Sequence, residues 1–151
     1  MTDKELMLKG ELYIPSNDPQ LAKDCARSRR ITRLFNATTE ADLDTREELI
    51  RELFGGTGEH FYIEPPFRCD YGSNIYIGEN FYTNFDCIIL DVCEVHIGDN
   101  VMFGPRVCVY TAGHPIDPGV RAEALEFGKP VTIGNNVWVG GNAVINPGLT
   151  I

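Results

Sequence analysis

Aliphatic side chains recur every six residues through the second half of this sequence, and most are followed by glycine or a small polar residue. The clearest series are Ile97, Phe103 and Val109, and then Ile133, Val139, Ile145 and Ile151. An α-helix repeats every 3.6 residues and a strand every two, so neither keeps a six-residue pattern on one face. The spacing instead predicts short strands joined by corners, with three strands in each triangular coil and the coils stacked into a solenoid.

The repeat is interrupted between Ile77 and Ile97, which are twenty residues apart. A regular coil of three six-residue units would need eighteen. We therefore expect a widened corner in the segment through Asn84 and Asp91. Departures from a local rule often mark functional sites, so this corner is of interest.

A longer interruption covers residues 111–130, and the hexad pattern resumes only at Val131. This stretch predicts a loop that projects from the coils. It contains His114, whose neighbours Gly113 and Pro115 restrict the backbone around it. Because loops held by a rigid scaffold often carry catalytic residues, His114 is a candidate for chemistry.

Helical signals precede the repeat. Asp18 and Pro19 match an N-cap and a first helical residue, and apolar side chains then recur at helical spacing up to Asn36. A second helix is expected from Asp44 and Glu47, which have the spacing of a capping box, and a pair of glycines ends it.

The pair Pro65-Pro66 excludes a helix at that point and predicts extended chain leading into the coils. We therefore divide the chain into an N-terminal helical segment, residues 1–58, and a hexapeptide-repeat β-helix, residues 59–151, with the extended loop at 111–130. The helical segment is expected to cover one end or side of the solenoid.

Composition excludes several classes of function. The formal net charge is -9, so phosphate backbones and anionic membranes are poor partners. No apolar run approaches the roughly 20 residues that span a bilayer, and a cytoplasmic protein is expected. One basic cluster is interpreted as a solvated helix face: Arg27, Arg29, Arg30 and Arg33. The five cysteines form no CxxC pair and are expected to be free, mostly buried thiols.

Four motifs carry a resemblance to a known family. They are Asp70-Tyr-Gly-Ser-Asn-Ile75, Asn80-Phe-Tyr-Thr-Asn-Phe85, Gly113-His114-Pro115 and Ile133-Gly-Asn-Asn-Val-Trp138. With them, the chain resembles the galactoside/maltose O-acetyltransferases of the hexapeptide-repeat acyltransferase superfamily, nearly from end to end. The resemblance implies a mainly β fold, a left-handed parallel β-helix with an N-terminal α-helical segment. It also implies a homotrimer that transfers acetyl from acetyl-CoA to a sugar hydroxyl at subunit interfaces, with no metal.

The resemblance also implies roles for single residues. His114 would be the catalytic general base, because an imidazole can accept a hydroxyl proton near neutral pH. Asn84, Asp70, Asp91 and Tyr82 would bind the acceptor sugar. Gly104, Trp138 and Gly141 would bind the cofactor, with an aromatic wall and small residues beside the pantetheine arm. The sequence does not distinguish galactosides, maltose, glucose and lipo-oligosaccharide precursors as acceptors.

Two other functions remain open at this point. His96 and His114 are eighteen residues apart, one nominal coil, so they could stack and contribute to a zinc site of the β-helix carbonic anhydrase type, which needs a third ligand. The chain could also be a trimerising module without activity. Family members continue through further coils that hold the distal part of CoA, so weak acetyl-CoA binding is expected. The candidate replacements for the phosphate contacts are Arg106, Lys129 and Arg121.

Overall fold

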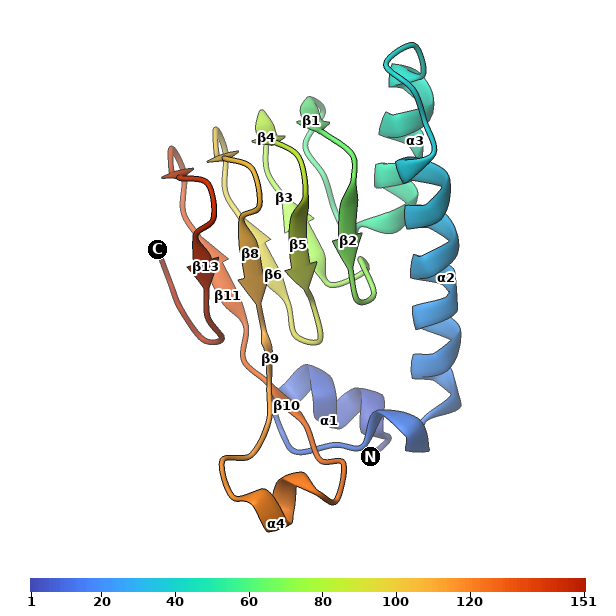
Figure 1. The fold of residues 1–151 in the computed structure, drawn as a ribbon, viewed down its shortest axis with the longest axis vertical. Helices are drawn as coiled ribbons and strands as arrows, with labels where there is room; N and C mark the ends of the chain where they lie inside the picture. The colour runs from blue at the N-terminus through green and yellow to red at the C-terminus, as the bar shows by residue number, and fades with distance from the viewer.

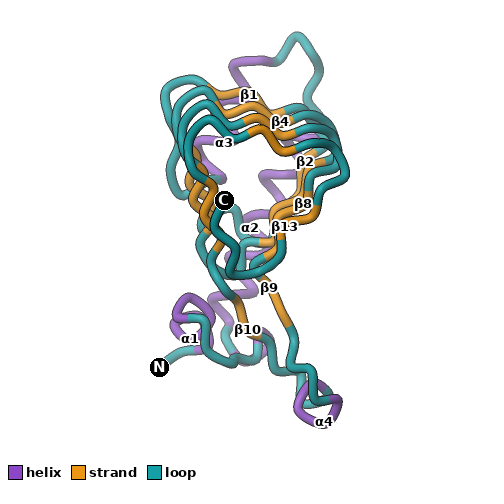
Figure 2. The backbone as a smooth tube through the Cα atoms, turned by 90° about the vertical axis from the view of Figure 1, so that its left-hand side faces the viewer, coloured by secondary structure: helices purple, strands orange, loops and turns teal.

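The computed structural model describes residues 1–151 and shows a three-sided parallel β-helix with helices over its N-terminal end (Figure 1). Seen along the solenoid, the three sides enclose a core (Figure 2). The strands of the first side are β1 (Phe61–Ile63), β4 (Phe81–Thr83), β7 (Met102–Phe103) and β12 (Trp138–Val139). Those of the second are β2 (Phe67–Cys69), β5 (Cys87–Leu90), β8 (Cys108–Tyr110) and β13 (Val144–Ile145). Those of the third are β3 (Ile75–Ile77), β6 (Val95–Ile97) and β11 (Val131–Ile133).

The parallel register places equivalent hexad residues above one another. Ile77 pairs with Ile97, and Ile97 with Ile133, and all three are buried. The residue before each points outward, so the inward column is apolar while the outward column varies. The hexad pattern therefore predicted both the strands and their inward faces.

The coils around Asp91 are longer than eighteen residues because one corner is widened. The inward positions Ile89 and Ile97 are eight residues apart, whereas the other steps in this coil are six. The two additional residues lie in the 91–94 corner between the second and third sides, and the 70–74 corner of the preceding coil is widened in the same way. The predicted widened corner is therefore confirmed and lies at Asp91.

Asparagine forms a column at the corner between the third and first sides. Asn80, Asn100 and Asn136 have φ angles of 56°, 56° and 59°, a left-handed conformation that asparagine tolerates better than most residues. Their side chains also bond along the column, from Asn80 to Asn100 at 3.1 Å and from Asn100 to Asn136 at 3.3 Å. Backbone conformation and side-chain bonding thus both favour asparagine here.

Replacing Asn100 with alanine is expected to destabilise the protein by about 1–2 kcal/mol, because alanine is strained at positive φ and ends the amide ladder. Asn100→Gly keeps the permitted backbone and removes only the ladder, so it should cost less. Urea unfolding of the three proteins measures both effects. Equal stability of the alanine variant and the parent would contradict this account of the corner.

The N-terminal helices are α1 (Asp3–Lys9), the 3₁₀ turn η1 (Pro15–Asn17), α2 (Pro19–Asn36) and α3 (Leu43–Leu53). The start of α2 was predicted correctly, since Asp18 accepts a hydrogen bond from the Gln20 N–H. The expected capping box at Asp44 is wrong: α3 begins at Leu43, and Asp42 in the N-cap position instead binds Thr39. A complete capping box caps α1, which the sequence reading missed.

Side chains from α2 and α3 pack on the first coil in one core with the solenoid. Ile31 and Phe35 of α2 and Ile50 of α3 are at most 1% exposed, and they belong to the same apolar cluster as the inward strand residues. The helices therefore cover the apolar end of the coil stack, as the sequence predicted. None of the helices is both long enough and apolar enough to span a membrane.

The loop of residues 111–130 contains β9 (Ala112–Gly113), α4 (Pro118–Arg121) and β10 (Phe127–Gly128). β9 and β10 pair antiparallel and close its base. A Cβ atom on Gly113 would lie 2.7 Å from the Phe127 ring, so any larger residue here would displace that ring. The chain then returns to the solenoid at Val131, which pairs with Val95.

Candidate active site

His114 lies directly after β9, at the start of the projecting loop. Its side chain is exposed, and its ring makes no hydrogen bond within the chain. It lines an open pocket of about 470 Å³. The other lining residues are Pro15, Ser16, Arg121, Ala124 and Glu126. The imidazole nitrogens are therefore free to exchange a proton with a molecule in this pocket, beside the polar side chains of Ser16, Arg121 and Glu126.

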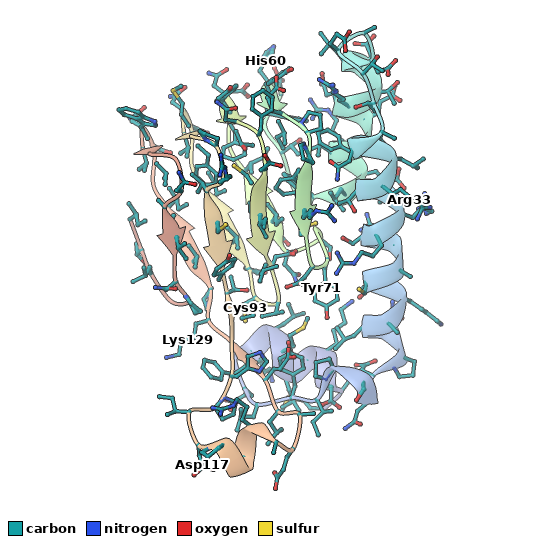
Figure 3. All side chains as sticks on the ribbon, viewed as in Figure 1. Arg33, His60, Tyr71, Cys93, Asp117 and Lys129 are labelled. Carbon is teal, nitrogen blue, oxygen red and sulfur yellow. The ribbon has the colours of Figure 1, made fainter.

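Arg121 braces the backbone beside His114. Its Nη1 donates to the Pro115 carbonyl at 3.1 Å and to the Ile116 carbonyl at 3.0 Å. Arg121 belongs to α4, which Asp117 caps by accepting the Val120 N–H at 3.0 Å, at the tip of the loop (Figure 3). The Asp-Pro signature that predicted α2 also precedes α4, and it could have revealed this short helix.

Glu126 joins the His114 pocket to the N-terminal segment. Its backbone bonds with that of Tyr13 in both directions at 2.9 Å, and its Oε2 accepts the Tyr13 hydroxyl at 3.1 Å. Burial, reinforced by the Glu126 charge, raises the pKa of Tyr13 above its usual range. The Tyr13 hydroxyl therefore stays protonated and holds Glu126 as a donor. No local sequence signal identified Ser16 or Glu126, because this pocket joins segments about 100 residues apart.

Asp70 lies near this pocket, at the widened corner after β2. Burial raises its pKa, the Arg29 charge lowers it, and the Glu126 charge raises it. Tyr71 and Cys93 lie between the coils and α1 (Figure 3). Asp70 is partly buried and has no side-chain partner within hydrogen-bond distance, so its carboxylate can accept hydrogen bonds from a ligand.

Asp91 does not occupy the position expected of a sugar contact. It is 0% exposed, and its carboxylate accepts the backbone N–H groups of Asp70 at 3.1 Å, Tyr71 at 2.9 Å and Asn74 at 3.2 Å. The widened corner needs these bonds because its backbone leaves the strand ladder. In this structure Asp91 is therefore inaccessible to a sugar and anchors the turn that carries Asp70.

Burial raises the pKa of Asp91 to about 7, although the N–H donors favour its charged form. An aspartate in the unfolded chain titrates near pH ~4. Between these values the folded protein binds one more proton than the unfolded chain, so stability falls as pH rises. We expect the free energy of unfolding of the parent, relative to Asp91→Asn, to be larger at pH 5 than at pH 8. Urea unfolding at both values tests this, and an equal difference would contradict it.

Five expected site residues lie elsewhere, on the first side and its corner with the second. Tyr82 points outward, stacks on Tyr62 at 6.1 Å and pairs along the sheet with Met102. Met102 in turn pairs with Trp138, whose side chain is 78% exposed. The first side thus presents a column of aromatic and apolar side chains to solvent.

Asn84 follows β4 at the corner of this side. Its Oδ1 accepts the Phe85 N–H at 2.8 Å, while its Nδ2 has no partner within the chain. Gly104 occupies the equivalent position one coil later, and a Cβ atom there would lie 2.6 Å from the Gly141 nitrogen. Close packing of successive coils therefore explains Gly104 without any ligand.

The predicted site residues consequently form two groups on different edges of the solenoid. We call Asp70, His114 and the loop pocket the loop half-site. We call Tyr82, Asn84, Gly104, Trp138 and Gly141 the column half-site. The first lies where the second side meets the third, and the other lies on the first side and where it meets the second. One chain does not bring the two half-sites together.

The expectation that His96 and His114 stack one coil apart is wrong. His96 lies in β6 between Tyr76 and Thr132, and its ring stacks on Tyr76 at 4.7 Å. The widened corners and the inserted loop change the register, so residues eighteen apart do not lie above one another. No three histidine, cysteine or acidic side chains lie close enough together to hold a metal ion.

Comparison with known structures relates this geometry to a family. A maltose O-acetyltransferase from Clostridium difficile 630 is 51% identical and superposes with a TM-score of 0.97, over 99% of this chain and 80% of that one. The chain belongs to the galactoside/maltose O-acetyltransferase family. Residues 6–58 also match the maltose acetyltransferase hexapeptide capping motif. These helices are therefore the family's cap on the coils.

Two further relatives of this acetyltransferase support the family assignment. A galactoside acetyltransferase solved in complex with coenzyme A is 40% identical, with a TM-score of 0.94 over 99% of this chain and 74% of that one. Nodulation protein L of Rhizobium meliloti is 45% identical over 149 residues, 99% of this chain and 81% of the relative. The fold is therefore the left-handed parallel β-helix of hexapeptide-repeat acetyltransferases. The chain spans about four fifths to three quarters of these proteins.

Proposed function

We propose that this acetyltransferase moves the acetyl group of acetyl-CoA to a hydroxyl of a sugar acceptor, with His114 as general base. The observation that carries the proposal is the exposed, unpartnered imidazole in an open pocket that the polar side chains of Ser16, Arg121 and Glu126 also line. Ser16, Arg121 and Glu126 supply hydrogen-bond donors and acceptors around it, which suits a polyhydroxylated molecule. Asp70 would accept a further hydroxyl.

His114 would take the proton from the acceptor hydroxyl as its oxygen attacks the thioester carbonyl. The new C–O bond forms, the C–S bond breaks, and the imidazolium returns its proton to the departing thiolate. Arg121 holds the backbone beside His114, so it would keep the imidazole in place through these steps. Binding both substrates in one cleft would contribute much of the rate, because it replaces an encounter in solution.

The separation of the two half-sites supports a homotrimer. A complete site would combine the loop half-site of one chain with the column half-site of its neighbour, and three such sites close a ring. Asn84 can donate from its free Nδ2 to the reacting molecules. Tyr82 would then contact the acceptor from the same column.

Acetyl-CoA is the proposed donor. The related galactoside acetyltransferase was solved with coenzyme A, and a hexapeptide-repeat acetyltransferase of Vibrio cholerae, 36% identical, with acetyl coenzyme A. In this chain the exposed Trp138 offers an apolar wall for the pantetheine arm, and Gly104 and Gly141 lie at the adjacent corner, where they would contact the arm through their backbone. Arg106 and Lys129 are exposed, and either could meet a phosphate.

Thiol release from acetyl-CoA, measured with a panel of galactosides, maltose and glucose, tests the proposal. Release that depends on the sugar is expected, and an acetylated sugar should be found by mass spectrometry. A chain that forms trimers but shows no saturable acetyl-CoA binding would support the alternative of an inactive assembly module. The same assay on the chain extended by the C-terminal coils of a relative would then show whether those coils are required.

A further inference from the structure

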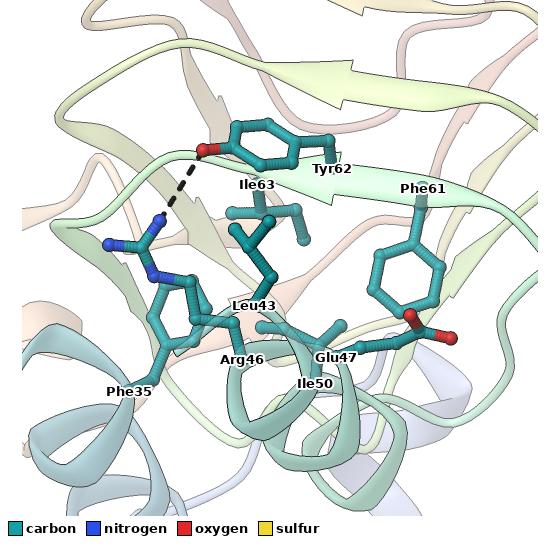
Figure 4. Close-up of a pocket in the computed structure, with 8 residues that line it drawn as sticks. All are labelled: Phe35, Leu43, Arg46, Glu47, Ile50, Phe61, Tyr62 and Ile63. Carbon is teal, nitrogen blue, oxygen red and sulfur yellow. Dashed lines mark hydrogen bonds between the residues drawn. The ribbon is translucent and has the colours of Figure 1, made fainter. Parts of the chain in front are cut away.

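A cavity of about 200 Å³ lies between α3 and the first coil, outside both half-sites (Figure 4). Six of its eight lining residues are hydrophobic, among them Leu43, Ile50 and Phe61. The other two are Arg46 and Glu47, which come from α3. A mostly apolar cavity with a few polar groups is the usual lining of a small-molecule site, and Arg46 is its cationic group.

Arg46 is the feature that points to a ligand. It is only 9% exposed, yet no carboxylate lies within 4.0 Å of its guanidinium group. Its Nε donates to the Thr38 hydroxyl at 2.8 Å and its Nη1 to the Tyr62 hydroxyl at 3.3 Å, so its protein partners are neutral. Burying a charge without a counter-ion is costly, and buried arginines are normally paired.

The neighbouring acids have other partners. Asp42 accepts the Thr39 N–H at 2.8 Å and the Thr39 hydroxyl at 3.0 Å, and these bonds, with a smaller contribution from Arg46, lower its pKa. Glu47 pairs with Arg51 at 2.7 Å. Glu64 accepts the Tyr62 hydroxyl at 2.7 Å. Arg46 is thus left as a hydrogen-bonded, oriented cation that lacks an anion.

We propose that this cavity binds a small organic carboxylate with an aromatic or branched apolar body. The carboxylate would meet the guanidinium of Arg46, whose planar fork matches two oxygens. The apolar body would contact Leu43, Ile50 and Phe61. An apolar cavity of about 150 Å³ is enough to hold benzene, so a cavity of about 200 Å³ is of a size to hold benzoate.

This site is independent of the proposed acetyl transfer but adjoins the column half-site. Tyr62 forms part of the cavity wall and stacks on Tyr82 with an interplanar angle of 10°. A bound carboxylate would compete with the bond from Arg46 to the Tyr62 hydroxyl. Binding of the carboxylate would therefore change the hydrogen bonding of Tyr62, which is in contact with Tyr82.

Benzoate is the probe, titrated into the full chain by calorimetry and by NMR, with benzyl alcohol and inorganic phosphate as comparisons. We expect saturable binding of one benzoate per chain. Benzyl alcohol should bind about 10- to 100-fold more weakly, because it cannot use the charge of Arg46. Inorganic phosphate, which has no apolar body, should also bind more weakly than benzoate.

Arg46→Met should weaken benzoate binding by about 10- to 100-fold. Arg33→Met is the matched control, because Arg33 projects from α2 away from the coils (Figure 3) and should change nothing. Leu43→Trp fills the cavity from its exposed rim and leaves the bonds of Arg46 in place, so it should abolish binding in a chain with an unchanged circular dichroism spectrum.

Three kinds of result would overturn the proposal, and none of them depends on acetyltransferase activity. The parent could show no saturable benzoate binding. Benzyl alcohol or phosphate could bind as well as benzoate. A variant could behave opposite to expectation, with loss of binding in Arg33→Met or with full binding in Arg46→Met or in the folded Leu43→Trp variant.

Discussion

Replacing His114 with alanine is expected to lower kcat for sugar acetylation by about 10²- to 10⁴-fold, the usual contribution of a general base. The KM for acetyl-CoA should change little, since the proposed contacts of the donor are with the column half-site. The fold should survive because the His114 side chain is exposed and makes no hydrogen bond within the chain. Thiol release at saturating acetyl-CoA, together with urea unfolding, measures both expectations.

His96→Ala is the matched control for this loss. His96 is also exposed, but it lies on the third side against Tyr76 and does not line the loop pocket. Its replacement should leave kcat unchanged. If His114→Ala kept full activity, or if His96→Ala lost as much, the proposed catalytic role of His114 would have to be abandoned.

Co-assembly of two variants of low activity is expected to restore activity. His114→Ala removes the loop half-site and Asn84→Ala damages the column half-site, the latter by about 10- to 100-fold through one lost bond to a reacting molecule. In trimers co-assembled from equal amounts, each interface has an even chance of receiving an intact loop half-site and, independently, an intact column half-site. The mixture should therefore recover about a quarter of the parental activity.

Co-expression followed by size-exclusion chromatography and thiol release provides the measurement. The two variants assembled separately and then combined without exchange form the control, and their activity should stay at the mean of the two variants alone. If the co-assembled mixture also stays at this mean, the two half-sites do not meet across an interface. If Asn84→Ala alone is fully active, Asn84 takes no part in the reaction.

The sequence predicted the repeat because its information is local and redundant. Successive coils repeat inward apolar residues and a positive-φ corner, as at Asn80 and Asn100, so one irregular unit does not obscure the pattern. The Asp-Pro start of α2 was equally local. The widened corner was predicted from the twenty-residue spacing of Ile77 and Ile97 alone.

The errors came where several residues of one kind compete or where distant segments meet. Asp42 and Asp44 are both possible caps for α3, and only the bond from Thr39 to Asp42 shows how that turn is closed. Asp91 has the chemistry of a sugar ligand, but its burial depends on a corner that the sequence does not describe. The pocket of Ser16, His114 and Glu126 depends on contacts between the N-terminal segment and the 111–130 loop, which no spacing rule reports.

The paired base of the 111–130 loop bears on how this protein can diversify. Ala112 and Gly113 pair with Gly128 and Phe127, and the solenoid resumes at Val131 in register with Val95. Closing a loop costs entropy that grows only slowly with its length. The segment carrying His114 and Arg121 can therefore lengthen, shorten or be exchanged between relatives while the coils beneath it keep their register. Selection for a new acceptor can then change this one segment with little effect on the stability of the coils.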